Sequence, residues 1–313
     1  MMPGAAAKPF HHSALLYDGD DAFLAGTVPF AREGIAAGEP VLVVLGARQR
    51  SLLRRALGAD SDRVSYADIE LVGRNPAQII PALEAFLNEG PPGRPVRAIG
   101  VPIYSGRTPD AIVECHLHEA LVNRAFADRD GISLLCPYDT STLPASVIQE
   151  ACCTHPVVSV DGHERVSDNY RGADVLPPAA QAPLRPPPST ARALGFDRHN
   201  LAEVRELVTE SAHRAGLDSS ATGEFVLGVH ELAANSVRHG GGIGVLRAWV
   251  EDGAAVCEVR DSGRIEDPLA GRHAPRSGQL GGWGLWLTNA ACDLVQIRSG
   301  AGGTVVRVHR RPA

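Results

Sequence analysis

The feature that most constrains the fold is a cluster of prolines near the middle of the chain. Six prolines fall within residues 177–188 of the 313-residue sequence. Proline fixes its own φ angle and has no amide hydrogen, so this segment cannot form the interior of a helix or sheet, and polyproline II is its expected state. We therefore predict a semi-rigid linker over residues 175–190, between a domain over residues 10–160 and a second domain over residues 191–313.

The residues before the linker alternate between two patterns. Short apolar runs, typical of strands buried on both faces, occur at 41–45, 96–101 and 132–136. Helix-like stretches occur around them, at 20–37, 47–57, 76–89 and 109–128. This alternation predicts an α/β fold with a parallel sheet, in which ligands bind beyond the carboxyl ends of the strands.

The residues after the linker follow a different order. Amphipathic helices are expected at 200–216 and 219–239, followed by a β-hairpin that turns at Asp252-Gly253. A glycine-rich stretch comes next, and the last expected elements are a helix at 284–291 and strands at 294–298 and 303–309. This order predicts an α/β sandwich with a mixed or antiparallel sheet.

The basic residues exclude several kinds of site. Lys8 is the only lysine among 30 basic residues, and the others are arginines. Codon bias explains such a skew without any function. The chain nevertheless cannot contain a P-loop with its lysine, a eukaryotic-type kinase lysine, a Schiff-base lysine or an S-x-x-K acyl enzyme.

Charge argues against a nucleic-acid partner. The net charge of −6 is carried by residues 1–189, whereas residues 190–313 are neutral, so neither part has the basic surface that nucleic-acid binding requires. The cluster of Arg307, Arg310 and Arg311 is expected to be a solvated tail.

Cysteine spacing and apolar patterning point to the cytoplasm. The six cysteines form no C-x-x-C pair, so we expect no zinc ribbon and mostly buried, reduced thiols. The sequence has neither a signal-peptide pattern at its start nor an apolar run long enough to span a membrane. A soluble cytoplasmic protein without a membrane partner is expected.

One face of the helix expected at 219–239 carries four polar side chains. Glu231, Asn235, Arg238 and His239 are spaced i, i+4, i+7 and i+8, so they share that face. On spacing alone, a solvated helix face explains them equally well.

Later motifs favour a binding site over a solvated face. Asp261-Ser262-Gly263 follows the second strand of the hairpin, where a carboxylate can accept a hydrogen bond from the amino group of adenine. Gly281, Gly282 and Gly284 open the next helix, where backbone N–H groups can approach phosphate. Gly303-Thr304 lies near the last strand. A glycine pair alone is a weak signal, but the ordered set is specific.

In this order, the motifs of residues 190–313 resemble the GHKL ATPase superfamily, and most of all the anti-sigma-factor serine kinases. The resemblance implies a Bergerat-type α/β sandwich that binds ATP and Mg²⁺, with a lid over residues 264–280. It implies that Glu231 is the general base and that Asn235 coordinates Mg²⁺. It also implies an adenine site formed by Asp261 and Gly263 with Thr304 acting through water, and a phosphate site lined by Gly281, Gly282, Gly284 and Leu285.

The sequence departs from the histidine-kinase branch of that superfamily in two ways. Arg238 and His239 stand where histidine kinases usually carry lysine followed by an aromatic residue; arginine can still neutralise phosphate, and His239 is common in the anti-sigma branch. A histidine kinase also needs a phosphoacceptor helix hairpin, but only the proline segment precedes the helix expected at 200, and the flanks of His199 offer no long dimerisation helix.

The first domain resembles the MEDS (DcmR-like) sensory domain. The similarity rests on His11-His12 through Tyr17, on residues 30–40, on Glu114 through Asn123, and on Cys136-Pro137-Tyr138-Asp139. It implies a RecA-like α/β fold that has lost its P-loop and senses a small molecule. The ligand contacts that we expect lie near strand ends or on one helix face: Tyr17, Tyr104, Glu114, His118, Tyr138 and Asp139. Glu114 and His118 fit either a hydrogen-bonded pair or a metal site.

Together these resemblances imply a two-domain switch. The second domain would phosphorylate serine or threonine on a STAS-type anti-anti-sigma partner and sequester a sigma factor, under control of the first domain and its unknown small-molecule ligand. Two alternatives stay open: a module that binds nucleotide and partner without phosphoryl transfer, and a sensor histidine kinase. A homodimer is compatible with each of these hypotheses.

Overall fold

The computed structural model of the chain describes residues 9–91, 93–160, 162–275 and 282–312. The chain folds into two compact units, Met1–Ala180 and Gln181–Ala313, each with its own sheet. None of the helices in the described ranges is long and apolar enough to cross a membrane. The limits predicted for the two domains, residues 10–160 and 191–313, stay predictions.

The first unit contains a seven-stranded sheet in the order β3-β2-β4-β5-β1-β6-β7. The strands are β1 (His11–Tyr17), β2 (Val41–Leu45), β3 (Val64–Asp68), β4 (Val96–Gly100), β5 (Ile132–Asp139), β6 (Val157–Val160) and β7 (His163–Val166). The helices are α1 (Gly19–Ala37), α2 (Ala47–Leu57), α3 (Ile69–Val72), α4 (Ile79–Asn88), α5 (Pro109–Ala125) and α6 (Ala145–Thr154), with short 3-10 helices at Gly58–Arg63 and Pro76–Gln78.

The first six strands are parallel, and only β7 runs antiparallel to its neighbour. This confirms the predicted RecA-like parallel fold, because helical crossovers join strands that run in one direction. The turn between β1 and α1 is where a P-loop would lie in such a strand–loop–helix unit. Here the first turn of α1 carries Asp20 and Asp21, whose negative charge disfavours phosphate.

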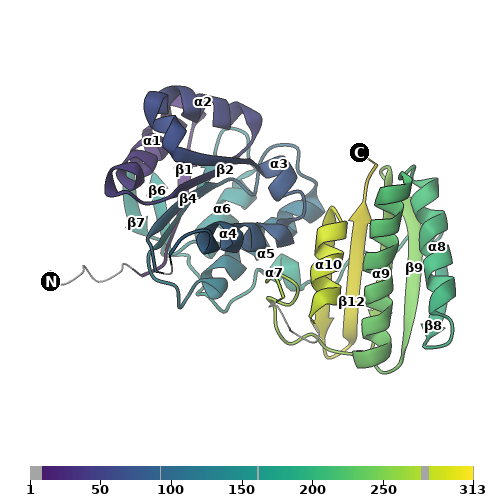
Figure 1. The fold of residues 1–313 in the computed structure, drawn as a ribbon. Coiled ribbons are helices and arrows are strands. Elements are labelled where there is room, and N and C mark those ends of the chain that lie inside the picture. Colours follow the sequence, from purple (N-terminus) through teal and green to yellow (C-terminus); the bar gives the residue numbers. More distant parts are fainter. Residues whose placement is uncertain (1–8, 92, 161, 276–281, 313) are drawn as a thin grey trace. The chain divides into compact units, whose positions relative to one another are not determined.

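Helices cover both faces of this sheet (Figure 1). On the side of α1 and α2, Leu15 and Tyr17 of β1 pack with Phe23 of α1 and the apolar residues of β2. α5 covers the opposite side together with α4 and α6. Because side chains alternate along a strand, His12 of β1 lies on the α5 side while Tyr17 lies on the α1 side.

The second unit contains a five-stranded antiparallel sheet in the order β11-β12-β10-β9-β8. The strands are β8 (Arg192–Asp197), β9 (Ile243–Glu251), β10 (Ala254–Asp261), β11 (Leu294–Gly300) and β12 (Gly303–Arg310). The helices are α8 (Leu201–Arg214), α9 (Ser219–His239) and α10 (Trp283–Ala291). They lie side by side on one face of the sheet (Figure 1). This confirms the predicted α/β sandwich, although β8 was not expected.

The core of the second unit lies between this face and the three helices. Phe225 and Val229 of α9 are fully buried against Val204 of α8 and Leu246 of β9. Apolar residues of α9 recur on one side of the helix, which leaves its other side free to carry polar groups.

The proline segment differs from the predicted linker, because part of it is helical and part of it is hydrogen-bonded to a sheet. Pro178–Gln181 forms one helical turn, α7, because proline is tolerated in the first turn of a helix, where its missing N–H costs nothing. The segment that follows is tied to the sheet of the second unit. Arg298 donates to the carbonyl of Ala182 at 2.9 Å, and Arg307 donates to the carbonyl of Arg185 at 2.6 Å.

The predicted solvated tail is also wrong for two of its three arginines. Arg307 and Arg310 belong to β12 and are 3% and 8% exposed. Arg307 pairs with the buried carboxylate of Glu258 at 2.5 Å, and Arg310 pairs with Glu224 at 2.9 Å. These partners lie on β10 and α9, so the local sequence of the tail gives no sign of them.

Candidate functional site

The polar face predicted on α9 exists and is held together by Arg238. Its guanidinium lies 3.5 Å from Glu231 Oε2 and 3.4 Å from Asn235 Oδ1. The Glu231 side chain keeps 26% of its surface exposed, so a substrate can reach its carboxylate. His239, in the last turn of the helix, is exposed.

α10 begins directly against these side chains. A methyl group on Gly284 would lie 2.8 Å from Asn235 Nδ2 and 3.2 Å from Glu231 Oε2, so only glycine fits there without a shift. Gly282, which caps the helix, has a φ of 81°. Farther along α10, the Thr288 hydroxyl donates to the carbonyl of Gly228 at 3.0 Å.

This packing brings the N-terminus of α10 to Glu231 and Asn235. The free N–H groups of that turn carry partial positive charge and can bind an anion. Leu285 packs on the core from the same turn. Gly281 lies outside the described residues.

Asp261 forms a second centre at the end of β10. The Ser236 hydroxyl donates to its Oδ2 at 2.6 Å, and the backbone N–H of Gly263 donates to its Oδ1 at 2.8 Å. Thr304 lies opposite Asp261 in the β10–β12 register, and its hydroxyl donates to the carbonyl of Gly263 at 2.9 Å. These contacts orient the carboxylate and leave it lone pairs with which to accept from a ligand.

Three further residues position Asp261, and of these only Gly303 belonged to the motif set recognised in the sequence. Ser236 anchors the carboxylate from α9. A methyl group on Gly240 would lie 2.5 Å from Asp261 Cγ, and one on Gly303, whose φ is 97°, would collide with the Asp261 carbonyl oxygen. The glycines are visible in the sequence, but the backbone approach that requires them comes from segments far apart along the chain.

The two centres are linked through neighbouring residues of α9. Asn235 meets the start of α10, and Ser236 holds Asp261. The described part of the predicted lid, 264–275, is anchored beside them, because Asn289 of α10 donates to the carbonyl of Gly271 at 2.9 Å. A carboxylate, an amide, a helix N-terminus and a second, oriented carboxylate can bind a nucleotide at its phosphates and at its base.

The ligand contacts expected in the first unit do not meet at one place. Tyr17 packs against Phe23 with tilted rings on the α1 side of the sheet, and burial beside Asp139 raises its pKa to about 12. Tyr138 lies on the opposite side, where its hydroxyl donates to Glu119 at 2.9 Å.

Of the other expected ligand contacts of that unit, Asp139 lies opposite Tyr17 in the β1–β5 register, and the rest lie elsewhere. Tyr104 packs under the guanidinium of Arg107, 4.6 Å from ring centre to Cζ. Asp139 accepts from Ser141 at 2.6 Å. Glu114 and His118 are buried on α5.

Comparison with known families gives two matches. Residues 11–156 match the MEDS model, described as the methanogen/methylotroph, DcmR sensory domain. Residues 196–310 match the histidine kinase-like ATPase domain, which implies that this part of the chain binds ATP.

The chain was also compared with curated proteins and with solved structures. No curated protein matches the chain. A solved structure, the RsbU and RsbW domains of Rv1364c from Mycobacterium tuberculosis, is similar at 25% identity with a TM-score of 0.28, over 38% of this chain and 32% of its own. This chain therefore spans about a third of the length of that structure. The two family matches show that the chain combines an N-terminal MEDS sensory domain with a C-terminal histidine kinase-like ATPase domain.

Proposed function

We propose that the second unit is an ATP-dependent serine/threonine protein kinase of the anti-sigma type. Its substrate would be a STAS-type anti-anti-sigma protein, its sequestered partner a sigma factor, and its regulator the MEDS domain. The observation that carries the proposal is the meeting of Glu231, Asn235 and Gly284 at the start of α10.

Each end of the nucleotide has a plausible binding group. Asp261, held by Ser236 and Gly263, would accept from the amino group of adenine. The glycines at 281, 282 and 284 would bind the phosphates together with the N–H groups of α10. Thr304 would support the adenine end through water.

The α9 face fits a magnesium nucleotide. Asn235 presents an amide oxygen, a ligand type suited to Mg²⁺, on the side of the guanidinium of Arg238, while its amide nitrogen faces Gly284. Asn235 would hold the ion, which supplies neutralisation of phosphate charge when it is bound. Arg238, whose side chain is 55% exposed, offers the positive charge that other phosphate sites take from lysine.

Glu231 is suited to be the general base. Its carboxylate would take the proton from an incoming serine or threonine hydroxyl. The hydroxyl oxygen then bonds to the γ-phosphorus, the bond from that phosphorus to the bridging oxygen breaks, and ADP leaves with the electron pair. The partner gains a phosphate ester, and Glu231 later releases its proton to water.

The segment before the ATPase domain favours an acceptor on another protein. Residues 182–200 contain the proline segment and β8 in place of a helical hairpin. The nearest histidine, His199, lies in the turn between β8 and α8, where its backbone N–H donates to Asp197 Oδ1. This arrangement supports transfer to a hydroxyl on a partner over transfer to a histidine of this chain.

Phosphoryl transfer by the full chain tests the proposal. The purified protein is incubated with γ-labelled ATP, Mg²⁺ and candidate STAS-domain proteins, and Mg-ATP affinity is measured by calorimetry in parallel. We expect the wild type to label a STAS partner. Glu231→Gln should lower the transfer rate by about 100-fold or more with nearly unchanged ATP affinity, because it removes only the base.

A second variant tests the metal-binding role. Asn235→Ala should weaken Mg-ATP binding by about tenfold or more, since it removes an interaction with a charged group. Asn88→Ala, at an exposed position in the first unit, is the matched control and should leave affinity and transfer unchanged. Partner binding without label transfer would overturn the kinase assignment in favour of a nucleotide-dependent binding module.

A further inference from the structure

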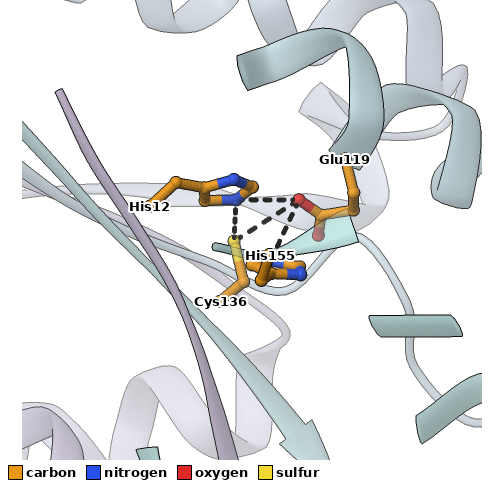
Figure 2. A group of neighbouring side chains, drawn as sticks. All are labelled: His12, Glu119, Cys136 and His155. Atoms are coloured by element: carbon orange, nitrogen blue, oxygen red, sulfur yellow. Dashed lines mark hydrogen bonds and ion pairs between the residues drawn. The ribbon is translucent and has the colours of Figure 1, made fainter. Parts of the chain in front are cut away.

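A second group of reactive side chains lies inside the MEDS domain, apart from the nucleotide site. His12 comes from β1, Glu119 from α5, Cys136 from β5, and His155 from the residue that follows α6 (Figure 2). None of the four is more than 2% exposed. Four elements thus place two imidazoles, a carboxylate and a thiol at one buried point, and Figure 2 shows all four converging there.

The distances among these groups match the edges of a metal-centred tetrahedron. Glu119 Oε2 lies 3.2 Å from His12 Nε2, 3.5 Å from His155 Nε2 and 3.6 Å from Cys136 Sγ, and the thiol lies 3.5 Å from His12 Nε2. Zinc bonds of about 2.0–2.3 Å in tetrahedral geometry place ligand atoms roughly 3.3–3.6 Å apart. All candidate ligand atoms of the group lie within 4.8 Å of one another.

The surrounding hydrogen bonds fix how the His12 ring presents its nitrogens. Asn123 Nδ2 donates to the carbonyl of Thr154 at 2.8 Å, which turns Asn123 Oδ1 toward His12 Nδ1 at 3.0 Å. Because that oxygen can only accept, the Nδ1 atom of His12 carries a hydrogen. Its Nε2 atom is then the one that faces Glu119.

The ring of His155 is fixed in the same way. Its Nδ1 atom lies 2.9 Å from the carbonyl of Ala151 and donates to it. Its Nε2 atom is fully buried and has no hydrogen-bond partner among the described residues. In the neutral ring, the Nε2 lone pair then points at the Glu119 carboxylate, 3.5 Å away.

The centre of the group therefore collects lone pairs. The Tyr138 hydroxyl donates to Glu119 Oε1, which leaves Oε2 as the oxygen that accepts from the Cys136 thiol and faces the Nε2 atoms of the two rings. A lone pair against a carboxylate in a dry interior is unfavourable unless a cation lies between them. Ring N–H groups bound to a carbonyl and an amide oxygen are also the second-shell arrangement that metal-ligating histidines adopt.

We propose that His12, Glu119, Cys136 and His155 bind one divalent transition-metal ion, with Zn²⁺ the best match. Imidazole and thiolate donors in tetrahedral arrangement select Zn²⁺ over Mg²⁺ or Ca²⁺, and four protein ligands make a closed, structural site. Binding releases the thiol proton and forms a metal–thiolate bond without a change of oxidation state. The ion would join β1, β5, α5 and the end of α6, so metal loading would set the rigidity of the sensory domain.

Metal content and cobalt substitution of the full chain test this site. Because the ligands are buried, the metal-free protein is prepared by unfolding in chelator and is refolded with or without one equivalent of Zn²⁺ or Co²⁺. We expect one ion per chain, a higher melting temperature with Zn²⁺, and a thiolate-to-cobalt charge-transfer band with Co²⁺.

Variants assign the ion to these residues. Cys136→Ala should abolish the charge-transfer band and weaken Zn²⁺ binding by more than about tenfold, whereas Cys152→Ala, at a half-buried cysteine outside the group, should change neither. Tyr138→Phe keeps the shape of the core and should keep the band, with weaker binding because Glu119 loses its orienting donor.

Two results would overturn the site. The first is a wild-type chain that takes up no Zn²⁺ or Co²⁺ and melts at the same temperature with and without them, which would leave a proton shared by His12 and Glu119 as the buried positive charge. The second is a charge-transfer band that survives in Cys136→Ala, which would place the metal on another cysteine.

Discussion

Asp261 illustrates, at the scale of single residues, how neighbours give a side chain its role. Its carboxylate accepts from Ser236 and from the backbone of Gly263, while Gly240 and Gly303 let the backbone approach it closely. The Ser236 hydroxyl and the Gly263 N–H each donate to one carboxylate oxygen. Asparagine replaces one of these oxygens with an NH₂ group, which is itself a donor and would face a donor there.

Asp261→Asn should therefore weaken both nucleotide binding and the fold. We expect the affinity for ATP to fall by about tenfold or more and the free energy of unfolding to fall by about 1–3 kcal/mol, measured by calorimetry and urea denaturation. Asp252→Asn is the matched control: Asp252 is exposed in the β9–β10 turn at a φ of 49°, which asparagine tolerates. An Asp261→Asn variant that binds ATP like the wild type would contradict the adenine assignment.

Single residues were predictable from the sequence where a local motif carries them. Helical spacing predicts that Glu231, Asn235 and Arg238 share one face, and in the structure Arg238 contacts both of the others. The buried group at His12 could not be found in this way, because its members are brought together only by the sheet order and by the packing of α5.

At the scale of elements, the start of α10 defines the site. At Gly284, α10 approaches α9 closely beside Asn235 and Glu231. The helix has nine residues, so its N-terminal N–H groups keep their positive character toward a bound phosphate.

Gly284→Ala should disrupt this approach. The added methyl would press on Asn235 and Glu231, so we expect ATP affinity to fall by about tenfold or more. Gly223→Ala is the control on α9: Gly223 is exposed with nothing within 4 Å of the added methyl, so this change should leave affinity unchanged and stabilise the fold by about 0.5–1 kcal/mol. Equal ATP affinities for the two variants would show that α10 does not contribute to the phosphate site.

Among the elements, those with strong periodicity were predicted and those with weak periodicity were not. α8, α9 and α10 follow their apolar stripes, and β2, β4 and β5 follow continuous apolar runs. β8 was missed because half of its six residues are exposed and only Phe196 is fully buried, so its sequence carries no clear burial pattern. It forms through backbone pairing with β9, which no local signal reports.

At the scale of the whole molecule, the proline segment is attached to the sheet of the ATPase unit and is not a free linker. Its backbone accepts from Arg298 and from the buried Arg307, both on the sheet. The sequence predicted the interruption of regular structure correctly, but the surface on which the segment lies depends on residues more than 100 positions away.

A fragment of residues 181–313 should therefore be more stable than one of residues 191–313. Loss of the segment exposes the guanidinium of Arg307 and its pair with Glu258 to solvent and removes a hydrogen bond to a charged donor. We expect a loss of about 1–3 kcal/mol, which lowers the melting temperature by several degrees in a domain of this size. Equal melting temperatures would mean that the segment contributes nothing to the fold.

The proposed function requires that the ATPase domain transfers the γ-phosphoryl group of ATP to a hydroxyl of another protein. The most direct measurement is the chemical identity of the amino acid that becomes labelled when the full chain, γ-labelled ATP and a STAS partner are combined. We expect an acid-stable phosphoserine or phosphothreonine on the partner, which disappears with Glu231→Gln. An acid-labile phosphohistidine on this chain would contradict it.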